Sequence, residues 1–97
     1  MRFTISSKRQ VLLKIECLES NDGALHVLTK HVLEMVALFA GFVGPEDSDE
    51  WFSAPQDSTA WELVPVGLED EKLQAIMKPG SRLKVCGPDA EIVLDID

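Results

Sequence analysis

Several absences narrow what this chain can be. Its 97 residues include no tyrosine, two cysteines and nine basic side chains, against 17 acidic ones. Cys17 and Cys86 lie far apart and are too few for a disulfide framework, so we expect free thiols in a reducing, cytoplasmic setting. The longest stretch without a charge, 35–45, is shorter than the roughly 20 apolar residues that a membrane-spanning helix needs. We therefore expect no membrane association.

Signatures of the common enzymes are missing as well. The sequence has no glycine-rich phosphate loop, no G-x-S-x-G, no C-x-x-C and no EF-hand spacing. His26 and His31 would diverge by about 140° on a helix, so they cannot share a metal ion there. Cys17 lies among alternating apolar residues, with no histidine at a spacing that would activate it. The absence of these signatures predicts a non-enzymatic protein without a metal or cofactor.

The chain has enough apolar residues to form a hydrophobic core. Hydrophobic residues make up 45% of it and charged residues 27%, a balance outside the disordered class. Its length fits one domain, and residues 1–97 contain no repeat that would mark a second. We expect a single acidic α+β domain with a two-layer core.

Alternation of apolar and polar residues predicts a hairpin near the start of the chain. Residues 2–5 and 11–17 alternate with period two, which is typical of half-buried strands. A three-residue turn at 7–9 would place Ile5 opposite Val11 and bring both apolar sets to one face.

A second hairpin is predicted near the other end. Strands at 82–86 and 91–96 flank a turn at 87–90, and this register sets Arg82 opposite Asp95 as an opposite-charge pair. A further strand is predicted at 60–66. The proline within it indicates that the strand lies at a sheet edge or ends there, because proline cannot donate to a hydrogen-bond ladder.

One long helix is expected at 23–42. Its apolar residues recur at steps of three and four, and after Glu34 it is apolar all round, so more than one side must be covered. The Gly-Pro pair at 44–45 is expected to end it. A short helix is predicted at 69–78, and 44–59 is expected to be a long loop without strand or helix.

These elements predict an α+β fold of order ββαβαββ. The sheet is expected to be mostly antiparallel and to pack on the long helix, which changes from amphipathic to apolar along its length.

The net charge of −8 is unevenly distributed. Residues 1–14 and 72–84 each carry +4, whereas 45–71 hold nine carboxylates and no basic side chain. Like charges repel within a Debye length of about 8 Å, so folding tolerates this segment best where water screens it. The segment is expected at the surface, either as a solvated face that keeps the protein soluble or as a docking surface for a basic partner.

The second possibility predicts a binding site. Two aromatic residues end a run of carboxylates, so the carboxylates could occupy a groove that normally holds nucleic-acid phosphates, with Trp51 as the apolar anchor. This predicts an acidic inhibitor, a nucleic-acid mimic of the immunity or anti-defence type, that docks on a basic protein surface. The predicted partner-binding residues are Glu46, Asp47, Asp49, Glu50, Trp51, Phe52 and Asp57.

Other interpretations stay open. Trp51 or Phe52 could fold back over the apolar end of the helix, which would remove it from a binding surface. Alternatively, the chain could be a subunit of a homo-oligomer or larger assembly that uses the apolar helix 23–43. Direct nucleic-acid binding is disfavoured, because a −8 protein repels phosphate and the two basic segments lack interleaved aromatic residues for stacking.

Overall fold

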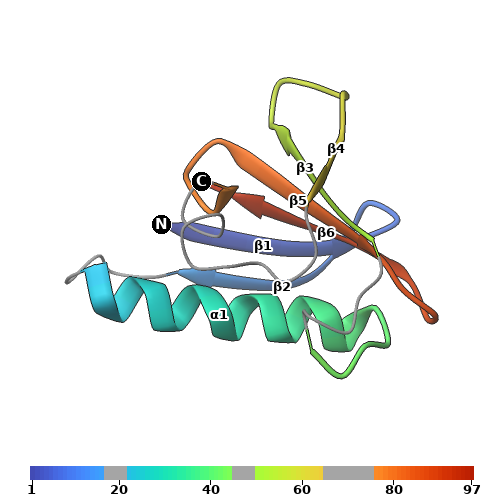
Figure 1. Ribbon diagram of the computed structural model, residues 1–97, viewed down its shortest axis with the longest axis horizontal. Coiled ribbons are helices and arrows are strands. Elements are labelled where there is room, and N and C mark those ends of the chain that lie inside the picture. The colour runs from blue at the N-terminus through green and yellow to red at the C-terminus, as the bar shows by residue number, and fades with distance from the viewer. Residues whose placement is uncertain (17–21, 45–49, 65–75) are drawn as a thin grey trace.

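The fold is a six-stranded sheet with a long helix along one face (Figure 1). The computed structural model describes residues 1–16, 22–44, 50–64 and 76–97. All neighbouring strands pair antiparallel, in the order β2-β1-β6-β5-β3-β4. The elements are β1 (Arg2–Ser7), β2 (Gln10–Glu16), α1 (Asp22–Phe39), β3 (Trp51–Pro55), β4 (Glu62–Val64), β5 (Ser81–Cys86) and β6 (Glu91–Ile96).

The predicted α+β class and antiparallel sheet are confirmed, but the order ββαβαββ is wrong. The described elements follow ββαββββ, because residues 51–55 form strand β3 within the segment expected to be a loop. β3 lies between β5 and β4 in the sheet. Its five residues, Trp-Phe-Ser-Ala-Pro, do not alternate apolar with polar side chains and end in proline, so the sequence did not indicate a strand. Most of the short helix predicted at 69–78 lies outside the described residues.

The first hairpin forms, but in a different register from the predicted one. Ile5 pairs with Leu13 rather than Val11, and the register shifts between Ile5 and Ser6. The turn has only two central residues, Lys8 and Arg9, with φ values of 50° and 65°. Positive φ at both positions is typical of the tight hairpin turn that glycine and asparagine favour, so Lys-Arg carried no sequence signal for it.

The C-terminal hairpin has the predicted register. Arg82 pairs with Asp95 across β5 and β6, and Leu83 pairs with Leu94. β1 then adds to the other side of β6, so the first and last strands of the chain lie side by side. Their ends are joined by two backbone hydrogen bonds, each of 2.9 Å, between Arg2 and Asp97.

β4 is shorter than the strand predicted at 60–66, but it lies at the sheet edge as predicted. Pro65, on which that prediction depends, lies outside the described residues.

The long helix ends earlier than expected. Its last helical residue is Phe39, and Gly41, with a φ of 93°, reverses the chain instead of the Gly-Pro pair at 44–45. The Gly41 N–H donates to the Leu38 carbonyl, and the Phe42 N–H donates to the Ala37 carbonyl. This pair of bonds is the Schellman arrangement, in which a glycine in the left-handed region satisfies the last carbonyls of a helix.

The core lies between α1 and the face of the sheet that the helix covers. The turn at 87–90 closes one end of it, because the Asp89 N–H donates a 3.1 Å hydrogen bond to the Ala40 carbonyl just beyond α1. The largest fully buried side chains come from β1, β5, β6 and α1: Phe3, Ile5, Leu33, Leu83, Ile92, Leu94, Ile96, Val32, Val36 and Val85.

Candidate functional site

The predicted partner-binding residues that the structure describes do not form one exposed surface. Glu50 lies immediately before β3 and Asp57 in the turn after it, and both are exposed. Glu46, Asp47 and Asp49 lie outside the described residues. The two acidic residues that can be placed therefore flank β3 at opposite ends.

Trp51 is not the exposed anchor that the sequence suggested. Its side chain is 4% exposed and belongs to the same buried cluster as Ala37 and Ala40 of the helix. It pairs with Val85 on one side and Val64 on the other, which puts it on the covered face of the sheet. The alternative, in which this ring folds back over the apolar end of the helix, agrees with the structure.

Phe52 points the opposite way, as the next residue on a strand must. It lies half-buried on the face of the sheet that α1 does not cover, which we call the open face. There it meets a basic side chain: Lys84 Nζ is 5.1 Å from the centre of the Phe52 ring.

Trp61 completes a cluster on the open face. Its ring lies 4.5 Å from Lys84 Nζ and 5.0 Å from Arg82 Cζ, measured to the ring centre. Both distances are within the range in which a cation is attracted by the negative face of an aromatic ring. Phe52, Trp61, Arg82 and Lys84 together are called the cation–aromatic cluster below.

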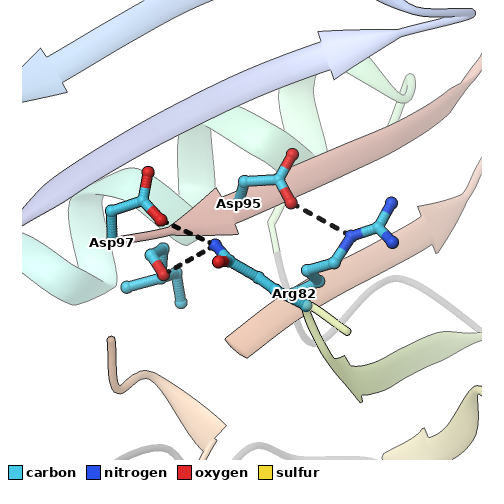
Figure 2. Close-up of polar contacts among 5 residues, drawn as sticks. Arg82, Asp95 and Asp97 are labelled. Atoms are coloured by element: carbon cyan, nitrogen blue, oxygen red, sulfur yellow. Dashed lines mark hydrogen bonds and ion pairs between the residues drawn. The ribbon is translucent and has the colours of Figure 1, made fainter. Parts of the chain in front are cut away.

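Arg82 also lies beside a carboxylate, that of Asp95. Figure 2 shows Arg82 and Asp95 on neighbouring strands, with Arg82 Nε 3.0 Å from Asp95 Oδ1. The N–H is not aligned for a hydrogen bond, so the contact is an ion pair between side chains that are about one-third exposed. Nearby, Gln56 Nε2 donates to the Ile96 carbonyl at 3.0 Å and to Asp97 Oδ1 at 2.9 Å, which ties the turn after β3 to the end of β6.

No aromatic residue is interleaved in the basic segment 72–84, but the fold brings aromatic rings from other parts of the chain beside Arg82 and Lys84. Strand pairing brings Phe52 beside Lys84, and the segment before β4 brings Trp61 over both cations of β5. In sequence the rings are more than 20 residues from these cations, so local spacing gave no signal. The cluster forms through the pairing of β3 with both β5 and β4.

A second exposed feature is apolar and lies on the outer side of α1. Met35, Leu38 and Phe39 share one side of the helix because they are three and four residues apart; Phe42 and Val43 follow its end. Leu38 is 62% exposed, Phe39 41% and Val43 85%. Met35 and Phe42 are half-buried and also pack against the core, so they border the three exposed side chains. These five residues, called the helix patch below, lie in the stretch 35–43, which the sequence predicts to be helical and covered on more than one side.

Cys86, the free cysteine among the described residues, is not set up as a nucleophile. Burial and the Glu91 carboxylate, whose Oε2 lies 3.8 Å from the thiol sulfur, raise its pKa. A raised pKa means less thiolate and slower reaction at neutral pH.

The described parts of the chain contain few other groups that could bind a metal ion or a small molecule. They contain no group of three or more histidine, cysteine or acidic residues that could hold a metal ion. A cleft of about 240 Å³ lies beside the start of β5, lined by Ser53, Ala54, Pro55, Glu62, Ile76, Lys78 and Ser81. Its opposite charges, Glu62 and Lys78, come from separate segments, and no hydrogen bond or ion pair between them is seen.

Comparison with known proteins adds no assignment. No family model, no curated protein and no solved structure matches the chain. In the part of the chain that the structure describes, no helix has the length and apolar character needed to cross a membrane. A functional interpretation therefore depends on the surfaces described above.

Proposed function

We propose that this protein is a non-enzymatic module that acts by binding protein, and that the helix patch is its main contact surface. The observation that carries the proposal is the exposure of three large apolar side chains, Leu38, Phe39 and Val43, at one end of α1. Scattered apolar residues are normal on a protein surface, but a contiguous group is typical of a protein–protein contact.

The partner that best fits the helix patch is a second copy of the chain. Residues 30–43, which include the patch, carry one lysine and one glutamate, so this stretch of the chain adds no net charge to a protein whose net charge is −8. The glutamate, Glu34, is also near a histidine: His31 Nδ1 lies 3.7 Å from Glu34 Oε2. Two such surfaces can meet without strong like-charge repulsion, and homodimer interfaces are more apolar than other protein contacts.

The molecular mass in solution tests this proposal. We expect light scattering to give a mass above the 10.7 kDa of one chain at micromolar concentration. Leu38→Glu should restore the single-chain mass, because a symmetric contact would bury the new charge twice. Val11→Glu is the matched control, since Val11 is 50% exposed but lies on β2, away from the patch. A wild-type protein that stays monomeric at several hundred micromolar would refute self-association.

A second candidate function is docking on a basic partner, as an acidic inhibitor. It is favoured by the exposed carboxylates Glu50 and Asp57 at the two ends of β3, on a chain with almost twice as many acidic as basic residues. Trp51 is buried and cannot serve as the anchor, so Phe52 is the aromatic residue of the predicted set that this function would have to use.

Charge reversal distinguishes the second candidate from the first. We expect Glu50→Lys combined with Asp57→Lys to abolish capture of a basic partner from a lysate of the native host, with little change in melting temperature. Glu16→Lys combined with Glu34→Lys is the control for net charge, because it changes two exposed acidic residues in the same way on β2 and α1 instead. Capture that persists in the double variant, or that does not weaken at high salt, contradicts docking through these carboxylates.

A further inference from the structure

We propose that the open face of the sheet, at the cation–aromatic cluster, is a docking site for an extended, acidic segment of a partner protein. This surface is separate from the helix patch. It would bind an acidic partner, whereas the acidic segment of the chain would bind a basic one. It goes beyond the proposed function, because self-association through α1 neither requires it nor uses it.

The first observation is that Lys84 has no carboxylate partner in the part of the chain that the structure describes. Within residues 1–16, 22–44, 50–64 and 76–97, its ammonium group makes no ion pair, and its nearest described contacts are the Trp61 and Phe52 rings. A ring face attracts a cation but does not neutralise it. Lys84 is half-buried, so its charge is held in a fixed place rather than on a freely moving side chain.

Arg82 offers a second point of attachment. Its Nε faces Asp95, which leaves the two terminal nitrogens of the guanidinium without a described partner. Those nitrogens form the edge of the guanidinium that binds a carboxylate through two parallel hydrogen bonds. The Trp61 ring against Cζ restricts the plane of the group, so less freedom is lost when a carboxylate binds.

The spacing of these cations matches an extended peptide. Arg82 and Lys84 are two residues apart on β5 and lie on the same side of the sheet. Two residues of a strand span roughly 6.6 Å. Side chains at alternate positions of an extended peptide have the same separation, so two carboxylates two residues apart can meet both cations.

An apolar residue beside the cations supports a peptide as the ligand. Leu63 pairs with Phe52 across β4 and β3, and Leu63 is 64% exposed. An acidic peptide with an apolar side chain next to its carboxylates would therefore make both kinds of contact.

Nucleic acid fits this face less well, because the positive region is short. Asp95 borders it on one side. Glu50 and Glu91 are close enough to Cys86, two residues beyond Lys84, to raise its pKa. A polyanion that continues past the two cations would meet these carboxylates, whereas a short acidic peptide would not.

Titration monitored by NMR tests the proposal, with ¹⁵N-labelled protein and a short peptide in which glutamate alternates with threonine and leucine. We expect saturable shifts of the Arg82 and Lys84 amides and of the Trp61 indole N–H. Lys84→Gln should weaken binding about tenfold, as expected for loss of a charge-assisted contact. Lys14→Gln, on exposed β2, removes the same charge from the same sheet and should leave the affinity unchanged.

Three results would overturn the proposal. These are no saturable shifts at the cluster up to millimolar peptide, equal binding of a peptide with glutamine in place of glutamate, and tighter binding of a single-stranded oligothymidylate. A melting curve of each variant shows whether it folds, and Arg82→Gln provides a second variant if Lys84→Gln does not. Because Leu38→Glu leaves the open face intact, peptide binding by that variant separates this inference from the proposed self-association.

Discussion

Replacing Gly87 by alanine tests how closely the β5–β6 turn packs on the end of α1. A Cβ added at Gly87 would lie 2.0 Å from the Ala40 carbonyl oxygen and 2.8 Å from the Ala40 Cβ. Real Cβ contacts are almost never shorter than 3.0 Å, so the turn or the helix end would have to move by about 1 Å. The clash is with backbone, which cannot rotate away as a flexible side chain would.

The expected cost can be estimated from two parts. Overpacking of this kind costs about 1–3 kcal/mol. A movement of 1 Å would also break the 3.1 Å hydrogen bond from the Asp89 N–H to the Ala40 carbonyl, which contributes about 1 kcal/mol. Gly87→Ala should therefore lower the free energy of unfolding by about 2–4 kcal/mol, which corresponds to roughly 10–25 °C in Tm for a domain of this size.

Urea unfolding followed by circular dichroism measures the effect, with Gly80→Ala as the control. No atom lies within 4 Å of the place that an alanine Cβ would take at Gly80, so alanine there costs only the backbone strain of its φ of 89°, about 1–2 kcal/mol. The packing argument is refuted if Gly87→Ala loses no more stability than Gly80→Ala.

Further predictions concern the two tryptophans and the described cysteine. Trp51→Ala should lower the free energy of unfolding, measured in urea, by about 3–5 kcal/mol, because it empties a core position. Trp61→Ala should lower it by only about 1–2 kcal/mol, through the lost contacts with two cations. Equal losses of stability would contradict the placement of the two rings on opposite faces of the sheet. Cys86 should react with iodoacetamide more slowly than a free thiol at pH 8, because burial and then Glu91 raise its pKa. Glu91→Gln lowers that pKa and should speed the reaction, as measured by mass spectrometry.

The parts of the fold that follow from local sequence pattern were predictable. The C-terminal hairpin combines a period-two pattern, turn residues and an opposite-charge pair, and its register is as predicted. α1 has a long helical periodicity and lies within a few residues of its predicted bounds, although Gly41 rather than the Gly-Pro pair ends it. A glycine at either place can end a helix, and sequence alone does not say which one takes the left-handed conformation.

The parts that depend on contacts between distant segments could not be predicted. β3 is a strand because β5 and β4 pair with it on both sides, while its own five residues have no clear periodicity. The same strand pairing explains why the predicted binding site was wrong about Trp51. Because Trp51 faces the core, Phe52 must face outwards, and the acidic segment loses its expected anchor. The cation–aromatic cluster was missed for the same reason, because its rings and cations meet only through that pairing.

The pairing of β1 with β6 also affects how the chain folds during synthesis. β1 cannot pair with β6 until β6 has left the ribosome, because the paired residues of these two strands are about 90 residues apart in the chain. Until then the edge of β1 that β6 covers is unpaired, in addition to the outer edge of β2, which has no partner strand in the sheet, and such edges can pair with other chains. Contacts between such distant residues slow folding. A chain released early, without β6, is therefore the form of this protein in which we expect aggregation first.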